Sequence, residues 1–299
     1  MNILLAEYAV SHDPALAPEG RAMLDILTSS FLKSGHTVHS PTEGKDFNEE
    51  IIRLGKLCDE GLVIAPDHLL ARYNKQLEDV TRNIGCNSFS AAICANKKRT
   101  GQILLSHGID VPREVFSGKR IVKQISGCGT VGVRLTEDPA REGEFGQEFI
   151  DGEHLSISLV GSRVVGESCL YYTGDTPLLL ALNRQDIRFS PDGLVSYHGG
   201  KTPVDHPRMK EIYESASKAV MVLGCQGYVG IDIIVNSDRI VIVDVNPRPT
   251  TSIVGIAACM EEEIGQIIID ASYGKAPASV HLKGHAKFSS DGTVTYDRS

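Results

Sequence analysis

The apolar positions in the first 65 residues alternate between strand-like runs and stretches with helical spacing. Asn2–Glu7 is a short apolar run that predicts a strand, and Glu19–Ser34 places its large apolar residues on one helical face. Thr37–His39 predicts a second strand and Asn48–Leu57 a second helix. Gly61–Ala65 is continuously apolar, as is typical of a parallel strand covered on both faces. The pattern predicts a βαβ-type unit at the amino terminus.

Helical spacing continues beyond this unit and then gives way to strands. Apolar residues spaced by three or four between Leu70 and Val80, and a further stretch between Ser88 and Gly108, predict helical regions. Arg120–Ile125 has the pattern of a strand, Ser126–Thr130 is rich in glycine, and Val131–Leu135 again has the pattern of a strand. These three segments predict a hairpin with a glycine-rich tip.

The second half of the chain combines antiparallel strands with one well-marked helix. Strands are predicted at Phe145–Ile150, Leu155–Val160 and Arg163–Gly166. A helix should start near Pro207 and end at Gly224, because apolar residues between them recur on one face. The predicted fold class is therefore α/β, with α+β character in the carboxyl-terminal half.

Composition narrows the classes of protein. The 299 residues are 41% hydrophobic and 23% charged, which is typical of a soluble globular protein and excludes low-complexity and collagen-like chains. The net charge is −8, so we expect no nucleic-acid partner. No apolar run approaches the roughly 20 residues that cross a bilayer, and the first residues lack the bases of a signal peptide, so we expect a cytoplasmic protein without a membrane partner. The seven cysteines include no C-x-x-C pair, which favours buried single thiols over a zinc site or disulfides.

The segment from Gly230 to Pro249 carries the most informative pattern. Two apolar strands flank a turn-rich junction, which predicts an antiparallel hairpin. If residues 237–239 form a three-residue loop, Asp232 faces Asp244 across the two strands. Asn246 projects from the same face as Asp244, because side chains alternate along a strand with a period of two.

Two facing carboxylates require neutralisation. At about 4 Å and an effective dielectric constant near 20, their repulsion is roughly 4 kcal/mol. Carboxylate and amide oxygens suit Mg²⁺, so Asp232, Asp244 and Asn246 form a candidate metal site. The alternative is that the carboxylates splay into solvent beside Arg239 or Arg248. A register shifted by one residue would also remove the facing pair.

The glycine-rich tip is a candidate phosphate-binding loop. Gly127–Gly132 matches G-x-G-x-x-G, but the segment that follows is extended rather than helical, which excludes a dinucleotide fold. Neither Walker nor protein-kinase motifs occur. Backbone amides at the tip could instead cover phosphates beside Lys123, with a simple tight turn as the alternative. Asn96–Thr100 supplies a second cationic cluster, for which a solvated face is the alternative.

Taken in order, these features resemble the ATP-grasp carboxylate–amine ligases. The elements that carry the resemblance are Asn96–Lys97 before a helix, Ile121–Lys123 with the glycine-rich tip, Gln147–Gly152, Gly230–Asp232 and Val243–Pro249. The resemblance implies a Rossmann-like pre-ATP-grasp domain at residues 1–94. It also implies two α+β subdomains that clamp ATP: a small one with the glycine-rich loop at 95–150, and a carboxyl-terminal one with the metal-binding hairpin at 151–299.

The resemblance also implies roles for individual residues. Those implied to bind ATP are Lys97, Lys123, Gly127, Cys128, Gly129, Thr130, Glu148, Phe149, Ile150 and Glu153. Those implied to bind Mg²⁺, with Mn²⁺ as an alternative, are Asp232, Asp244 and Asn246. Arg248 and Lys123 are implied to be catalytic, with Arg248 stabilising the phosphoryl group or the carboxylate substrate. Many family members place an acid for the ribose where this chain has His154, so Glu153 is the neighbouring substitute.

The implied reaction joins a small-molecule carboxylate to a small-molecule amine through an acyl phosphate. Glu7–Tyr8 and Glu19–Leu24 are similar to a subgroup of archaeal ligases that attach the γ-carboxylate of glutamate to tyramine in methanofuran synthesis, which implies that Glu7, Tyr8 and Glu19 lie near the acceptor. The alternatives are an ATP-grasp ligase for another amino acid or cofactor precursor, and a nucleotide-binding sensor without turnover. The oligomeric state is open, and a homodimer is compatible with the sequence.

Overall fold

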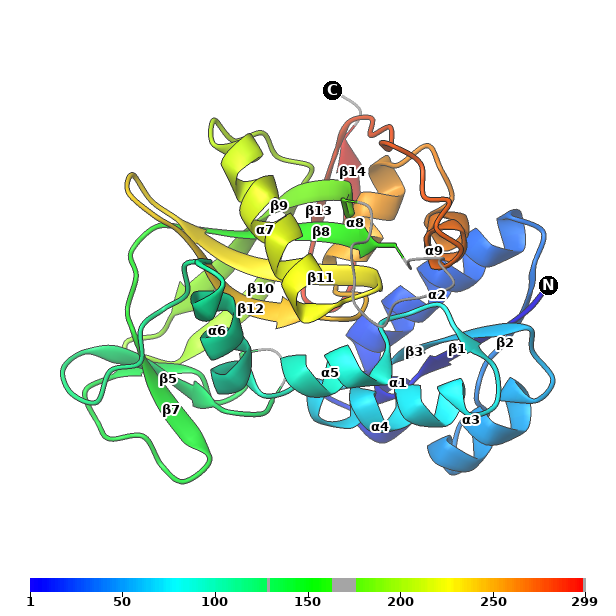
Figure 1. Cartoon of the computed structure of the whole chain (residues 1–299), viewed down its shortest axis with the longest axis horizontal. Helices are drawn as coiled ribbons and strands as arrows, with labels where there is room; N and C mark the ends of the chain where they lie inside the picture. Colours follow the sequence, from blue (N-terminus) through cyan, green and yellow to red (C-terminus); the bar gives the residue numbers. More distant parts are fainter. Residues whose placement is uncertain (128–129, 163–175, 298–299) are drawn as a thin grey trace.

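The computed structural model of the chain describes residues 1–127, 130–162 and 176–297 (Figure 1). Within these residues the strands form three sheets, with the orders β2-β1-β3-β4, β6-β5-β7 and β12-β11-β8-β9-β10-β13-β14. The first sheet is parallel and the other two are antiparallel. The α/β fold with an antiparallel second half is therefore confirmed. The predicted strand at Arg163–Gly166 lies outside the described residues.

The parallel sheet is covered on both faces. Its strands are β1 (Asn2–Glu7), β2 (Thr37–His39), β3 (Glu60–Ile64) and β4 (Arg82–Asn83). Ile3 and Leu5 face α2 (Ala17–Lys33) and α9 (Ile264–Ser272), whereas Leu4 and Ala6 face α3 (Phe47–Gly55) and α4 (Asp67–Glu78). This two-sided burial explains why β1 and β3 are continuously apolar. A short helix, α1 (Ala9–His12), follows β1.

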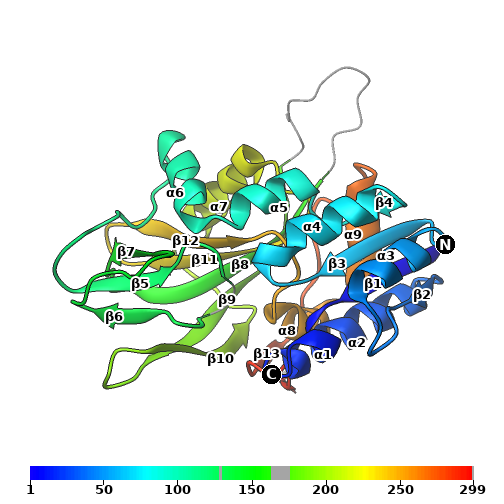
Figure 2. The same ribbon diagram turned by 90° about the horizontal axis from the view of Figure 1, so that it is seen from below.

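The large antiparallel sheet has one apolar face, and its other face combines polar side chains with an apolar part that packs in a second core. Its strands are β8 (Glu153–Gly161), β9 (Leu178–Phe189), β10 (Val195–Thr202), β11 (Gly227–Val235), β12 (Ile240–Asn246), β13 (His285–Phe288) and β14 (Val294–Asp297). Leu155, Ile157 and Ile231 pack in one core with α6 (Lys97–Ser106) and α7 (Met209–Leu223), which lie over one side of the sheet in Figure 2. The alternate residues Ser156 and Asp232 point to the opposite side.

The remaining elements are two helices and the three strands of the small antiparallel sheet. They are α5 (Ser88–Cys94), α8 (Ser252–Cys259), β5 (Arg120–Gln124), β6 (Arg134–Thr136) and β7 (Glu144–Glu148). The helical stretch predicted between Ser88 and Gly108 is divided into α5 and α6, because the side chain of Asn96 caps α6 by accepting a hydrogen bond from the Arg99 N–H (2.9 Å).

One predicted strand is shorter than expected. The hairpin of β5 and β6 is present, but β6 begins only at Arg134 rather than at Val131. Gly132 has a φ of 72°, and the Val133 N–H donates to the Thr130 carbonyl (3.0 Å), so the chain is still turning there. The prediction was wrong for residues 131–133, because a left-handed glycine prevents a continuous strand.

The described residues also bear on the cysteines and on membrane insertion. Five free thiols, at Cys58, Cys86, Cys94, Cys225 and Cys259, are buried as predicted, whereas Cys128 and Cys169 lie outside the described residues. None of the helices in the described part of the chain has the length and apolar character that a membrane span requires.

Candidate active site

The hairpin of β11 and β12 brings Asp232 directly opposite Asp244, as predicted. The predicted three-residue loop was wrong, however, because Val235 pairs with Ile240 and the loop contains residues 236–239. One additional residue in β12, Val243, lies between the pair Ile233–Ile242 and the pair Asp232–Asp244. This β-bulge offsets the longer loop and restores the facing carboxylates.

The bulge also links the hairpin to the rest of the site. The Ile242 N–H donates to the Asp110 carbonyl (2.9 Å) rather than to β11, and the carbonyl of Val243 accepts a hydrogen bond from Lys123 Nζ (3.0 Å). Lys123 belongs to β5, in the small antiparallel sheet. The bulge therefore attaches the acidic hairpin to the strand that precedes the glycine-rich tip.

Two buried lysines flank Asp244. Lys97 Nζ donates a hydrogen bond to Asp244 Oδ2 and lies 3.8 Å from Asp67 Oδ2. Burial lowers the pKa of Lys97, but Asp244 and Asp67 outweigh it, so the pKa lies above its ordinary value. Burial lowers the pKa of Lys123 to about 8. Burial raises the pKa of Asp244, yet both lysines hold it below its ordinary value.

Asp232 has a different environment. Its carboxylate accepts hydrogen bonds from Gln185 Nε2 (2.8 Å) and from Asn246 Nδ2 (3.4 Å), both of which are neutral. Burial and the facing Asp244 raise the pKa of Asp232 to about 6. Asp232, Asp244 and Asn246 thus lie together, and one of the two carboxylates lacks a cation as a direct partner among the described residues.

The arginines that could have separated this pair bind elsewhere. Arg239 donates to Asp110 (2.8 Å) and to Glu148 Oε1 (2.9 Å), and Arg248 Nε donates to Asp67 Oδ1 (2.9 Å). The two aspartates are therefore not splayed apart by Arg239 or Arg248. A facing, partly unneutralised pair of carboxylates with an adjacent amide fits a hard divalent cation with oxygen ligands.

A small, mostly apolar cleft lies beside the hairpin. Its walls include Ile121, Phe149, Ile150, His154, Phe189 and Val243. Glu148 also lines the cleft, where its carboxylate is held by Arg239 and by the Arg113 N–H (3.1 Å). Burial lowers the pKa of His154, which favours the neutral imidazole. Apolar walls with a few fixed polar groups suit a planar nucleobase.

The other residues predicted to bind ATP do not all lie at the cleft. Glu153 pairs with Arg184 (3.0 Å) and is largely exposed, outside the residues that line the cleft. Gly127 and Thr130 flank the glycine-rich tip, whereas Cys128 and Gly129 lie outside the described residues. The Lys97 N–H donates to the Ile125 carbonyl (2.9 Å), which places the start of α6 beside this tip.

The residues that we expected near the acceptor lie on the parallel-sheet side. Glu7 ends β1, is buried and accepts hydrogen bonds from the N–H groups of Ala9 (3.1 Å) and Val10 (2.7 Å). Burial raises the pKa of Glu7. Glu19 accepts a hydrogen bond from the Thr251 hydroxyl, and the Tyr8 ring stacks on His12 at a centroid separation of 4.6 Å.

Sequence patterns missed several residues of the site. Asp67 lies three residues after the end of β3, so the rule that ligands bind at the carboxyl ends of parallel strands could have identified it. Asp110 and Gln185 lie outside any motif that we recognised, and their contacts with Arg239 and Asp232 span 129 and 47 positions of sequence. Such long-range partners carry no local signal.

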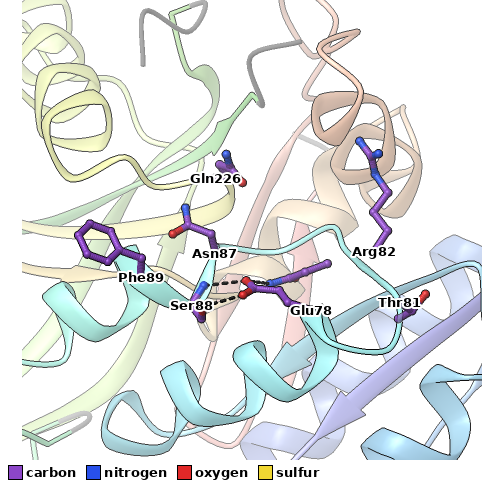
Figure 3. Close-up of a pocket in the computed structure, with 8 residues that line it drawn as sticks. Glu78, Thr81, Arg82, Asn87, Ser88, Phe89 and Gln226 are labelled. Atoms are coloured by element: carbon purple, nitrogen blue, oxygen red, sulfur yellow. Dashed lines mark hydrogen bonds between the residues drawn. The ribbon is translucent and has the colours of Figure 1, made fainter. Parts of the chain in front are cut away.

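A second hollow, of about 540 Å³, lies between the end of α4, the start of α5 and the start of β11 (Figure 3). Two of its polar residues bond each other: Glu78 accepts hydrogen bonds from the Ser88 N–H (2.8 Å) and hydroxyl (2.6 Å). Asn87 Nδ2 donates to the Gly224 carbonyl (3.0 Å). This hollow shares no lining residue with the acidic hairpin.

Comparisons with known proteins identify the family of this chain. Residues 94–252 match the ATP-grasp domain family. The chain is 33% identical to a tyramine–L-glutamate ligase of Methanocaldococcus jannaschii over 284 residues, covering 85% of this chain and 84% of the relative. It is 30% identical to a tyramine–L-glutamate ligase of Methanocaldococcus fervens over 295 residues, covering 89% and 92%.

Solved structures show the same fold. A protein of Archaeoglobus fulgidus from the ATP-grasp superfamily superposes with a TM-score of 0.77 at 23% identity, covering 96% of this chain and 92% of that one. The N5-carboxyaminoimidazole synthetase of Staphylococcus aureus, complexed with ADP, gives a TM-score of 0.68 at 14% identity, covering 96% and 81%. This chain therefore belongs to the ATP-grasp family and is an ATP-dependent ligase that joins a carboxylate to an amine.

Proposed function

We propose that this protein joins the γ-carboxylate of glutamate to the amine of tyramine, converting ATP to ADP and phosphate. The observation that carries the chemistry is the facing pair of Asp232 and Asp244 with two buried lysines beside it. The choice of substrates is supported by the two tyramine–L-glutamate ligases, which align with most of this chain.

The proposed reaction has two steps, and the atoms balance in each. A carboxylate oxygen of glutamate attacks the γ-phosphorus of ATP, and ADP leaves. The amine nitrogen of tyramine then attacks the acyl carbon, phosphate leaves with the bonding electron pair, and the amine loses a proton. Because negative charge passes from the carboxylate to ADP in the first step and to the leaving phosphate in the second, the protein mainly positions the reactants and neutralises charge.

The acidic hairpin is suited to a cation that accompanies ATP. Asp232, Asp244 and Asn246 would hold Mg²⁺, with Mn²⁺ as an alternative, and the cation would neutralise charge on the phosphates. Lys97 and Lys123 lie next to this cluster and supply further positive charge. Since burial keeps the Lys123 pKa near 8, its ammonium is charged at neutral pH yet held away from water.

The remaining residues orient the two ends of the nucleotide and the substrate. The cleft of Phe149, Ile150 and Phe189 would take adenine, with Glu148 fixed at its edge by Arg239. Arg248 offers a guanidinium to the reacting carboxylate or to the transferred phosphoryl group. Glu7 and Glu19 supply negative charge on the parallel-sheet side, where an ammonium group of the substrates would bind.

ADP release by the purified protein tests this function. With ATP and Mg²⁺, tyramine and glutamate together should release ADP at least about tenfold faster than either alone. Mass spectrometry should identify a γ-linked glutamyl amide. Phenethylamine, which lacks only the hydroxyl of tyramine, and aspartate, which is one methylene shorter than glutamate, are the matched substrate controls. Stimulation by a different amine and carboxylate, and not by tyramine with glutamate, would contradict the substrate assignment.

A further inference from the structure

Asp67 is a buried carboxylate to which neither the sequence motifs nor the reaction above assigns a role. It is the first residue of α4, and its side chain is 3% exposed. It follows the carboxyl end of β3, which lies beside the carboxyl end of β1, where Glu7 is found. Ligands of parallel α/β sheets bind at this edge, so Asp67 lies where substrates of the parallel-sheet half are expected.

Asp67 contacts two cations from the ATP-binding half. Its Oδ1 accepts a hydrogen bond from Arg248 Nε at 2.9 Å, and its Oδ2 lies 3.8 Å from Lys97 Nζ. Lys97 begins α6 and Arg248 follows β12. The two cations therefore come from opposite ends of the segment that matches the ATP-grasp domain, residues 94–252. One carboxylate of the parallel-sheet half therefore links two cations of the proposed phosphate site.

The partners of Lys97 show why Asp67 matters. In this structure Lys97 is shared between Asp244 and Asp67. Asp244 is also a ligand in the proposed cation site, and a carboxylate that binds a divalent cation attracts a neighbouring ammonium less strongly. Asp67 is then the carboxylate that remains with Lys97. A buried ammonium without such a partner would be strongly unfavourable.

We propose that Asp67 is a positioning residue for phosphoryl transfer, which holds Lys97 and Arg248 in their working orientation when the phosphates and the cation are bound. This inference rests on the proposed function, because it takes from it the roles of Lys97, Arg248 and Asp244. Asp67 acts through the two cations and does not itself touch the nucleotide.

The test compares Asp67→Asn, Asp67→Glu and a control. Asp79→Asn is the control, because Asp79 follows the same helix at its other end and pairs with Lys75 on the surface, with a side chain that is 59% exposed. Misplacement of catalytic groups by about 1 Å lowers rates roughly 100-fold, so we expect Asp67→Asn to lower kcat about 10- to 100-fold. The KM for ATP and the calorimetric Kd for ADP should stay within about threefold. Asp67→Glu, which keeps the charge, should recover a large part of kcat, and Asp79→Asn should match the wild type.

Two results would overturn the proposal. One is a kcat of Asp67→Asn within threefold of the wild-type value. The other is a joint loss of kcat, ADP binding and melting temperature that Asp67→Glu does not restore, because this would show a purely structural role. Wild-type turnover of tyramine with glutamate is measured first. If that pair is inactive, the ratio of variant to wild type is measured with the amine and carboxylate that do release ADP, so a wrong substrate does not count against Asp67.

Discussion

Two carboxylates of this molecule have opposite electrostatic environments. One is the buried Glu50 in the parallel-sheet half, and the other is the partly buried Asp232 in the acidic hairpin. Glu50 accepts hydrogen bonds from Arg53 Nε (2.6 Å) and Nη2 (2.7 Å), and from the Thr42 N–H (3.0 Å). The bidentate arginine lowers the pKa of Glu50 to about 2. Asp232 has two neutral amide donors and faces another carboxylate, and its pKa is raised to about 6, first by burial and then by Asp244.

The difference distinguishes a charge that stabilises the fold from one that we assign to the proposed cation site. Glu50 has all the donors that its charge requires, so it fastens the segment around Thr42 to α3 and stabilises the fold. Asp232 is incompletely neutralised by the described protein groups, while the pKa of nearby Lys123 is lowered to about 8. Opposing pKa shifts within one cluster are typical of a site whose charge is completed by a ligand. If the proposed cation binds here, the folded protein is destabilised at this site until the cation is bound.

The largest expected effect comes from removing a charge at the hairpin. Asp244→Asn should lower ligase turnover by at least about 1,000-fold, because it removes a carboxylate of the proposed cation site and the hydrogen-bonded partner of Lys97. Turnover is measured as ADP release at saturating ATP, and circular dichroism checks the fold. Glu50→Gln is the matched control, since it also neutralises a buried acid, and its turnover should equal that of the wild type. Retention of a tenth or more of the activity by Asp244→Asn would show that Asp244 is not part of the site.

A smaller effect is expected at Asp232, where a substitution should increase the stability of the folded protein rather than impair it. Its folded-state pKa of about 6 lies above the unfolded value of about 3.8, so the folded protein holds this proton more tightly. Stability is thus lost as the pH rises from about 4 through 6, by on the order of 3 kcal/mol. Without divalent cations, Asp232→Asn should melt at a higher temperature than the wild type at pH 7.5, and the difference should vanish below pH 4.

Divalent cations sharpen this second prediction. Adding Mg²⁺ should raise the melting temperature of the wild type at pH 7.5 and leave that of Asp232→Asn nearly unchanged, because only the wild type has both carboxylates. A variant that is less stable than the wild type at pH 7.5 would contradict the view that Asp232 is destabilising in the folded protein.

The sequence predicted the strands and helices of these two regions better than it predicted the contacts between them. Continuous apolar runs marked β1 and β3 because both faces of their sheet are covered, and the helix that ends at Gly224 was marked by its periodicity. The pairing of Asp232 with Asp244 was predicted from a loop that is one residue too short. The pairing is nevertheless correct, because the β-bulge at Val243 adds one residue to β12. The sequence gives no sign of this bulge, because Val243 is an apolar residue within an apolar strand.

Charged networks were less predictable. A run of charges such as residues 97–99 is usually solvated. In this chain the neighbouring lysines have different environments: Lys97 is buried against Asp244, whereas Lys98 pairs with the partly exposed Glu114. Lys97 and Asp244 are 147 positions apart, so only the tertiary fold brings them together. Strand β9, which supplies Gln185, has a buried first half and a largely exposed second half, so no single period marks it.

The smallest expected effect tests the structural side of the comparison. The folded-state pKa of Glu50, about 2, lies below its ordinary value of 4.5, so its ionised form stabilises the fold above about pH 4.5 and that contribution disappears as the pH falls toward 2. Glu50→Gln should therefore lower the melting temperature at pH 7 by about 2–4 °C, which corresponds to roughly 1 kcal/mol, and by much less at pH 3. Mg²⁺ should shift the melting temperature of Glu50→Gln as much as that of the wild type, because Glu50 lies outside the cation site. A difference that persists undiminished at pH 3 would mean that packing, rather than the charge of Glu50, fastens this segment to α3.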